Sequence, residues 1–158
     1  MSEGRIALTP EGREKMVKEL EVLKSTKRRE IAKDLAEARA HGDLSENAEY
    51  DAAKEAQAKL EKKISDIEDT LMRATIIDTS RMPKDQALVG TTVKLRDKNT
   101  GEKFDYMLVS EEESDFDLNK ISVTSPVGEA LVGHKVGETV EIEVPAGILE
   151  YEIIGITR

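Results

Sequence analysis

The chain has 158 residues, with 33 acidic side chains against 24 basic ones, two histidines and no cysteine. The lack of cysteine excludes disulfide scaffolds, zinc ribbons, iron–sulfur clusters and thiol catalysis. A formal net charge of −9 disfavours autonomous binding to nucleic acid, which needs clustered basic side chains against the phosphates. No apolar run approaches the roughly 20 residues of a membrane span, and the N-terminus lacks the apolar region of a signal peptide. We therefore expect a cytoplasmic protein without a membrane partner.

The first half of the chain is predicted to be an antiparallel helical hairpin. Residues 11–74 contain no proline and mostly strong helix formers, and Thr9, Pro10 and Glu11 are typical of a helix start. Apolar residues then recur at spacings of three and four in two stripes, as in a coiled coil. The stripes comprise Met16, Leu20, Leu23, Ile31, Leu35 and Ala38, with position 27 skipped, and Ala53, Ala56, Leu60, Ile64, Ile67, Leu71 and Ala74. Residues 41–47 between the stripes allow only a tight reversal.

After residue 78 the apolar pattern changes to a period of two, which is typical of strands. Strands are predicted over residues 89–97, 103–109, 121–123, 139–144 and 149–156, with a short helix over 126–132. Phe104, Tyr106, Phe116 and Tyr151 lie on or near these strands and are predicted to be core residues. The sequence thus predicts an α+β protein of two domains: a coiled-coil hairpin over residues 1–78 and a small antiparallel sheet with a short helix over residues 79–158.

Four carboxylates, with no lysine or arginine between them, lie within nine positions at the predicted tip of the hairpin: Asp43, Glu46, Glu49 and Asp51. Their oxygens suit Mg²⁺, which takes one or two protein carboxylates and completes its shell with water, phosphate or another protein. Asp43 and Glu46 fit a helix capping box equally well, so metal binding and capping both remain open. Because the tip has no evident nucleophile or pocket, a partner must complete any active site.

Basic residues concentrate midway along the predicted hairpin and beside its tip. The mid-hairpin residues either follow a phosphate backbone or form a solvated face paired with carboxylates. They are Lys24, Lys27, Arg28, Lys62 and Lys63. Arg39 and Lys54 flank the tip on opposite arms, where each could hold a carboxylate or a phosphate oxygen.

The segment at residues 37–54, EARAHGDLSENAEYDAAK, closely resembles the tip of the bacterial Gre transcript-cleavage factors. The similarity extends over the whole chain, including ISVTSPVGEALVG at residues 121–133, and the acidic balance fits the GreA branch of the family. The resemblance implies an accessory factor that is not an enzyme by itself. Its C-terminal domain would be FKBP-like and would dock on bacterial RNA polymerase, while the coiled coil enters the secondary channel of the polymerase.

The resemblance also implies roles for individual tip residues. Asp43 and Glu46 match the two essential acidic positions of the family, which help to hold a second Mg²⁺ shared with the polymerase. Glu49, Arg39 and Lys54 match neighbouring positions with supporting roles. The expected function is stimulated cleavage of backtracked RNA, with the nascent RNA 3′ end as a further partner. We expect the free protein to be a monomer that does not hold the ion stably. The alternatives are a channel-binding inhibitor without cleavage activity and a generic coiled-coil adaptor.

Overall fold

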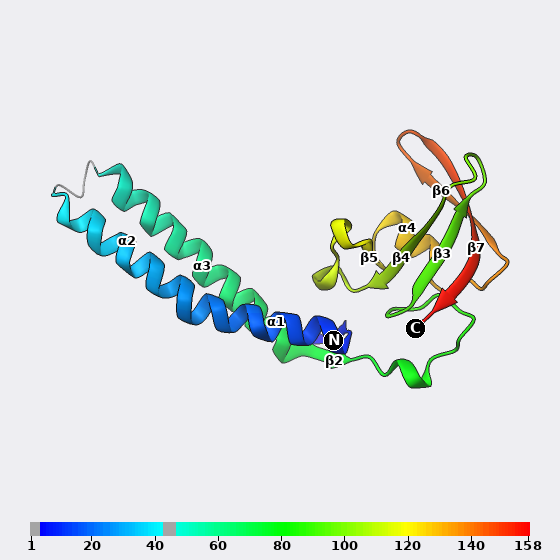
Figure 1. Ribbon diagram of the computed structural model, residues 1–158, viewed down its shortest axis with the longest axis horizontal. Coiled ribbons are helices and arrows are strands. Elements are labelled where there is room, and N and C mark those ends of the chain that lie inside the picture. Colours follow the sequence, from blue (N-terminus) through cyan, green and yellow to red (C-terminus); the bar gives the residue numbers. More distant parts are fainter. Residues whose placement is uncertain (1–3, 43–46) are drawn as a thin grey trace. The chain divides into compact units, whose positions relative to one another are not determined.

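The computed structural model describes residues 4–42 and 47–158 and contains a long helical hairpin and a curled sheet (Figure 1). Contacts within the chain group it into two units, one of residues Arg13–Arg73 and one of Met1–Gly12 together with Ala74–Arg158. The domain boundary expected between residues 78 and 79 stays a prediction. No helix in the described part of the chain is long and apolar enough to cross a membrane.

The hairpin forms as the two apolar stripes predict. Its first arm consists of α1 (Pro10–Val22), a π-helical turn η2 (Leu23–Lys27) and α2 (Arg28–Ala40), and its second arm is α3 (Ala48–Arg73). Leu23, Leu60 and Ile64 are buried between the arms. The antiparallel helical hairpin is therefore confirmed, and its stability comes from burial of this shared apolar face.

The π-helical turn explains the position that the first stripe skips. Leu23 and Ile31 both face the second arm, although Lys27 midway between them is exposed. A π turn adds a residue to the helix, so the apolar stripe passes Lys27 and returns to the face that meets α3. In the same region Ser25 Oγ donates a hydrogen bond to the carbonyl of Glu21 at 2.7 Å.

A short parallel strand pair, which the sequence analysis did not predict, joins the beginning of the chain to the end of the hairpin. β1 (Ile6–Leu8) pairs with β2 (Ala74–Ile76), and the Ile77 amide donates to the Leu8 carbonyl at 2.9 Å. Ala74 therefore lies in a strand and does not end the helical stripe as predicted. β2 follows α3 directly at Ala74 and its pairing partner lies 68 positions earlier, so the apolar pattern alone did not reveal this pair.

The other five strands form one mixed sheet in the order β5-β4-β3-β7-β6. They are β3 (Thr92–Asp97), β4 (Lys103–Val109), β5 (Lys120–Ser122), β6 (Thr139–Val144) and β7 (Gly147–Thr157), and α4 (Pro126–Leu131) is the short helix. Three pairings are antiparallel, but β4 and β5 run parallel, so the prediction of an antiparallel sheet is wrong in this respect. Two 3-10 turns, η4 (Glu111–Glu113) and η5 (Phe116–Leu118), make the crossover that a parallel pair requires.

The sheet has an apolar core. Val93, Leu95, Leu108, Leu131 and Ile153 are completely buried. The Phe104 ring packs edge-to-face against the rings of Tyr106 and Tyr151, with centroids 5.1 and 5.0 Å apart, and burial raises the pKa of the Tyr151 hydroxyl.

Phe116 is the exception among the four aromatic residues predicted for the core. Its side chain lies in η5 and is 79% exposed, so this prediction is wrong. The crossover between the parallel strands interrupts the alternation of inward and outward side chains on which the prediction depended.

A buried carboxylate holds the beginning of the first helix. Glu113 in η4 is 9% exposed and accepts hydrogen bonds from the Thr9 amide at 2.8 Å and the Thr9 hydroxyl at 2.7 Å. Thr9 Oγ1 in turn accepts from the Gly12 amide at 3.0 Å, which confirms the predicted N-cap. A Cβ at Gly12 would lie 1.8 Å from a Glu113 carboxylate oxygen, so a larger residue here would have to displace the carboxylate from Thr9.

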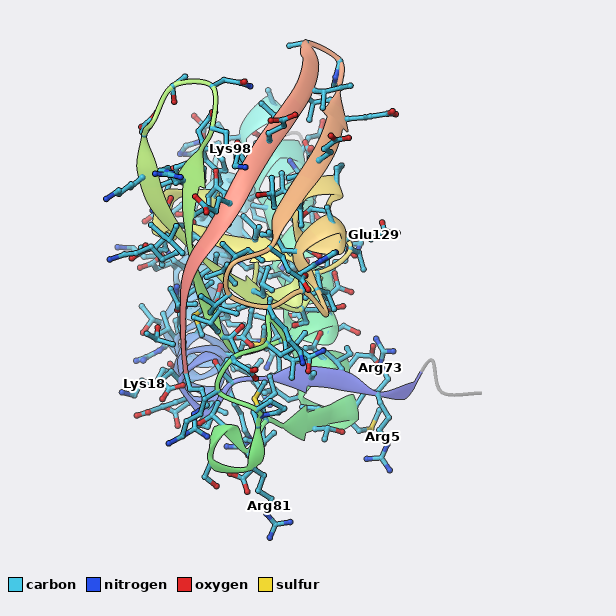
Figure 2. All side chains as sticks on the ribbon, turned by 90° about the vertical axis from the view of Figure 1, so that its right-hand side faces the viewer. Arg5, Lys18, Arg73, Arg81, Lys98 and Glu129 are labelled. Atoms are coloured by element: carbon cyan, nitrogen blue, oxygen red, sulfur yellow. The ribbon has the colours of Figure 1, made fainter. Side chains whose placement is uncertain are left out.

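The segment after β2 is tied to the end of the chain. A 3-10 turn η3 (Thr79–Arg81) is capped by Asp78, which accepts from the Ser80 amide at 3.1 Å. Arg81 at its end points away from the ribbon (Figure 2). The Arg158 guanidinium donates to the carbonyls of Thr79 and Met82 at 2.7 and 3.2 Å, so the last residue holds this segment in place.

Candidate functional site at the hairpin tip

The structure describes both flanks of the predicted tip. Asp43 and Glu46, the two candidate ligands of Mg²⁺, lie outside the described residues, so the predictions about them stay predictions. On the first flank, α2 ends at Ala40 and Gly42 has a φ of +107°, a conformation that favours glycine. On the second flank, α3 begins at Ala48.

The N-cap of α3 is Asn47. Its side-chain Oδ1 accepts a hydrogen bond from the Tyr50 amide at 3.1 Å, and its backbone carbonyl accepts from the Asp51 amide at 3.1 Å. The capping alternative assigned this role to Asp43, four positions earlier. Among the described residues, the cap of α3 is thus Asn47, and the role of Asp43 stays a prediction.

The predicted supporting residue Glu49 meets the opposite flank of the tip. One of its carboxylate oxygens lies 2.7 Å from His41 Nδ1. The sequence alone does not show that these two residues meet, because the directions of their side chains across the reversal depend on the fold. The only indication in the sequence is that His41 and Glu49 stand on opposite sides of a predicted tight reversal, which brings the two positions close together.

A hollow of about 360 Å³ opens between the arms next to this contact. Acidic, histidine and small side chains line it: Asp34, Glu37, Ala38, His41, Glu49, Ala52, Ala53 and Ala56. Within residues 4–42 and 47–158, no group of three or more histidine or acidic side chains is arranged to hold a metal ion. A metal site at the tip would therefore depend on Asp43 and Glu46 together with ligands from a partner.

Arg39 and Lys54 lie at the two flanks of the tip, as their sequence positions predict. The Arg39 guanidinium lies over the Tyr50 ring, 5.9 Å from its centroid, which is a cation–π distance. Lys54 Nζ donates to the side chain of Gln57 at 3.3 Å. Both contacts leave the positive charge in place, so either side chain can still attract an anion. Their supporting roles stay predictions.

All five candidate RNA-contact residues pair with carboxylates. The nitrogen–oxygen distances are 3.3 Å for Lys24–Glu68, 3.4 Å for Lys27–Glu30, 2.9 Å for Arg28–Glu61, 2.8 Å for Lys62–Asp66 and 2.9 Å for Lys63–Glu19. Exposed ion pairs of this kind contribute little to stability, so a phosphate can compete for the cation. The structure thus shows an ion-paired face, and contact with RNA stays a prediction.

The pair of Arg28 and Glu61 gives a pH-dependent prediction. Arg28 donates through Nε and Nη2 to the two Glu61 oxygens, each at 2.9 Å, and these bonds lower the pKa of Glu61 below its ordinary value. A lowered pKa in the folded state means that the pair stabilises the hairpin above the ordinary carboxyl pKa and loses this effect as the pH falls through the lowered value. NMR titration of Glu61 should show the lowered midpoint, and Arg28→Gln should return it to the ordinary range. An unchanged midpoint in that variant would contradict the assignment.

Comparison with known proteins decides the family. The family model described as "Transcription elongation factor, N-terminal" matches residues 6–76, and the one described as "Transcription elongation factor, GreA/GreB, C-term" matches residues 82–158. The chain belongs to the GreA/GreB family of transcription elongation factors. The resemblance found in the tip segment and in residues 121–133 is thereby confirmed. Membership covers both the hairpin and the sheet.

Curated GreA/GreB proteins are similar to this chain over nearly its whole length. Transcription elongation factor GreA of Prosthecochloris aestuarii is 53% identical over 154 residues, which are 96% of each chain. Transcription elongation factor GreA of Flavobacterium psychrophilum is 51% identical over 150 residues, 95% of each chain. Among solved structures, GreA factor homolog 1 of Thermus thermophilus is 31% identical, covering 98% of this chain and 99% of that one, with a TM-score of 0.45. The names of the curated relatives agree with the GreA branch.

Proposed function

We propose that this protein binds bacterial RNA polymerase through its secondary channel and stimulates Mg²⁺-dependent cleavage of backtracked RNA. One observation carries the proposal beyond family membership. Asn47 caps α3, so the acidic residues at positions 43 and 46 precede a helix that is already capped, at the end of a two-helix hairpin. The cap at Asn47 leaves these two carboxylates without an assigned role in the helix, and the proposal assigns them to a partner. Because bacterial transcription takes place in the cytoplasm, the proposal also locates the protein there.

The two halves of the chain would have different roles in this function. Residues 79–158 would form the FKBP-like domain that docks on the polymerase, and the hairpin would carry the tip to the active centre. Support for the first assignment comes from the curled mixed sheet with its short helix α4. Support for the second comes from the two long arms, which pack against each other through Leu23, Leu60 and Ile64.

Asp43 and Glu46 would hold one Mg²⁺ ion together with groups of the polymerase. The donor set fits this role, because carboxylate oxygens are preferred ligands of Mg²⁺ and two of them leave most of its shell open for a partner and water. When bound, the ion lowers the pKa of a water molecule and stabilises negative charge on the phosphate. Arg39 and Lys54, at the flanks, would attract the RNA phosphate or orient the acidic residues.

The decisive experiment uses a backtracked bacterial polymerase complex whose RNA is labelled at its 3′ end. Addition of the protein with Mg²⁺ should release short labelled fragments, and the shortened RNA should then be extended when nucleotides are supplied. A complex halted without backtracking serves as the control and should release no such fragments. Binding without cleavage would favour the channel-binding inhibitor, and absence of binding would leave the coiled-coil adaptor.

A further inference from the structure

We infer that the segment between β4 and β5 carries a docking surface of the sheet unit, which binds a basic, partly apolar region of RNA polymerase. We call it the crossover surface. It consists of the exposed apolar and acidic residues of this segment: Glu111, Glu112, Phe116, Asp117 and Leu118. The inference rests on the proposed function for the identity of the partner, and it assigns binding residues to the sheet unit.

The apolar part of the crossover surface consists of two large side chains exposed by one turn. In η5, Phe116 is 79% exposed and Leu118 is 55% exposed. Exposure of large apolar side chains so close together in the chain is informative, because folding tends to bury such groups and a partner would bury them instead. The Phe104, Tyr106 and Tyr151 rings pack together without Phe116. The aromatic core of the sheet is therefore complete without it.

The turn that presents these side chains is held by hydrogen bonds. The amides of Asp115 and Lys120 donate to each other's carbonyl oxygens at 2.8 and 2.9 Å. The Asp115 carboxylate caps η5 by accepting from the Asp117 amide at 3.1 Å. Asn119 ends the turn with a φ of +56°, and its amide donates to the Phe116 carbonyl at 3.0 Å. Because the backbone is already bonded in this way, binding would require little ordering of the turn.

The acidic part of the crossover surface indicates the chemistry of the partner. Residues 111–117, EEESDFD, include five acidic ones, and Glu111, Glu112 and Asp117 are exposed. No ion pair in the part of the chain that the structure describes involves any of these three carboxylates. They favour a partner that supplies lysine or arginine, and they repel the phosphates of nucleic acid. Two copies of a chain with a formal net charge of −9 also repel each other, so a second copy fits this surface less well.

An aromatic side chain beside charged ones is a common arrangement in protein interfaces. The aromatic anchor enters a pocket of the partner and contributes most of the affinity, whereas the charged rim mainly speeds association. The matching region of the polymerase would be an apolar pocket bordered by basic side chains. The two parts of the crossover surface therefore predict different kinetic effects, which an experiment can separate.

The test measures binding of the protein to an immobilised backtracked polymerase complex by biolayer interferometry, which gives the dissociation constant and both rate constants. Phe116→Ser and Leu118→Ser each remove an apolar side chain, and Asp117→Asn removes one charge. Ile148→Ser is the matched apolar control, because Ile148 in β7 is 56% exposed. Glu141→Gln in β6 is the charge control, because Glu141 is exposed as well.

Phe116→Ser should raise the dissociation constant about thirtyfold through faster dissociation, the size typical of an aromatic anchor. Leu118→Ser should raise it about fivefold. Asp117→Asn should slow association about twofold at low salt, and this effect should fade as the salt concentration rises. Ile148→Ser and Glu141→Gln should bind like the unmodified protein. Cleavage at a fixed, subsaturating protein concentration should fall in the same order as the affinity.

Three results would overturn the inference while the proposed function stands. The first is unchanged binding of Phe116→Ser and Leu118→Ser, and the second is an equal loss of affinity in Ile148→Ser. The third is a dimer of the free protein in sedimentation that Phe116→Ser dissociates, which would make a second copy the occupant. Urea unfolding midpoints equal to that of the unmodified protein would show that weaker binding comes from the lost contact, and a lowered midpoint that accounts for the whole defect would overturn the inference.

Failure of the proposed function gives a different result. An unmodified protein that binds the polymerase without cleaving would overturn that function alone, because the loss of affinity in Phe116→Ser would still support the crossover surface. An unmodified protein that does not bind the polymerase would overturn both.

Discussion

Replacement of Asp43 by asparagine is expected to reduce stimulated RNA cleavage at least about a hundredfold. Loss of an outer-shell partner of a metal site already costs about 10- to 100-fold, and Asp43 is proposed as a direct ligand. Asparagine keeps the size of the side chain but removes the negative charge that attracts Mg²⁺. The fold should be unaffected, because Asn47 caps α3. The measurement is the cleavage rate of the backtracked complex at saturating protein.

The control for this variant comes from the same acidic cluster. Asp51 lies in the first turn of α3 and is exposed, and Asp51→Asn removes one negative charge eight residues further on. We expect Asp51→Asn to retain most of the cleavage rate, and both variants to bind the polymerase like the unmodified protein. Equal rates for Asp43→Asn and the unmodified protein would contradict the metal role. Equal losses in both variants would assign the effect to overall tip charge.

A second large effect is expected from Gly128→Ala in the sheet unit. A Cβ at this position would lie 2.0 Å from the Ser122 carbonyl oxygen and 2.9 Å from the carbonyl carbon. That oxygen cannot move aside easily, because it accepts from the Ser125 hydroxyl at 2.6 Å and the Ser125 amide at 3.0 Å. Overpacking against backbone should lower the free energy of unfolding by about 3 kcal/mol. Urea unfolding followed by circular dichroism measures the change.

Gly155→Ala is the matched control for that substitution. Gly155 lies in β7, its φ is not positive, and the nearest atom to a Cβ there is the Lys94 Cβ at 3.6 Å, an ordinary contact. This variant should keep the free energy of unfolding within about 1 kcal/mol of the unmodified protein, because alanine also restricts the unfolded chain. If Gly128→Ala proved equally mild, strand β5 would have to be more mobile than its hydrogen bonds indicate.

The helical hairpin could be predicted because the pattern that specifies each helix lies within a short stretch of sequence. Each apolar stripe repeats within one helix, and a stripe as long as that from Ala53 to Leu71 is hard to confuse with any other structure. The skipped position at Lys27 was visible as well, although its cause was not. The π turn in the first arm is stabilised by packing against the second arm. The sequence of the first arm alone therefore does not predict it.

Features that depend on distant partners could not be predicted. The pairing of β1 with β2 joins residues 68 positions apart, as in Ile6 with Ala74, and β2 follows α3 without an intervening loop. The hydrogen bond between Thr9 and Glu113 joins residues 104 positions apart. In the sequence, Glu113 is one of three consecutive glutamates, and nothing there distinguishes it from the other two. The direction of β5 was equally hidden, because side-chain alternation is the same in parallel and antiparallel strands.

At the candidate site, the sequence indicated which residues matter but not how their neighbours are joined. The acidic cluster and the flanking Arg39 and Lys54 were identified from residue type and spacing. The capping alternative placed the helix start too early, because Asp43 and Asn47 are both good cap residues and spacing alone does not choose between them. The contact between Asn47 and the Ala38 carbonyl required the three-dimensional arrangement of both arms.

The sheet unit takes its residues from both ends of the chain, and residues 13–73 lie between these two stretches in the sequence. The hairpin is in this sense an insertion into the sheet unit, and its length does not depend on the residues of the sheet. Removal of seven residues from each arm would shorten the hairpin by about 10 Å while preserving the heptad register. Equal changes in the two arms can therefore lengthen or shorten the hairpin without any change in the residues of the sheet unit.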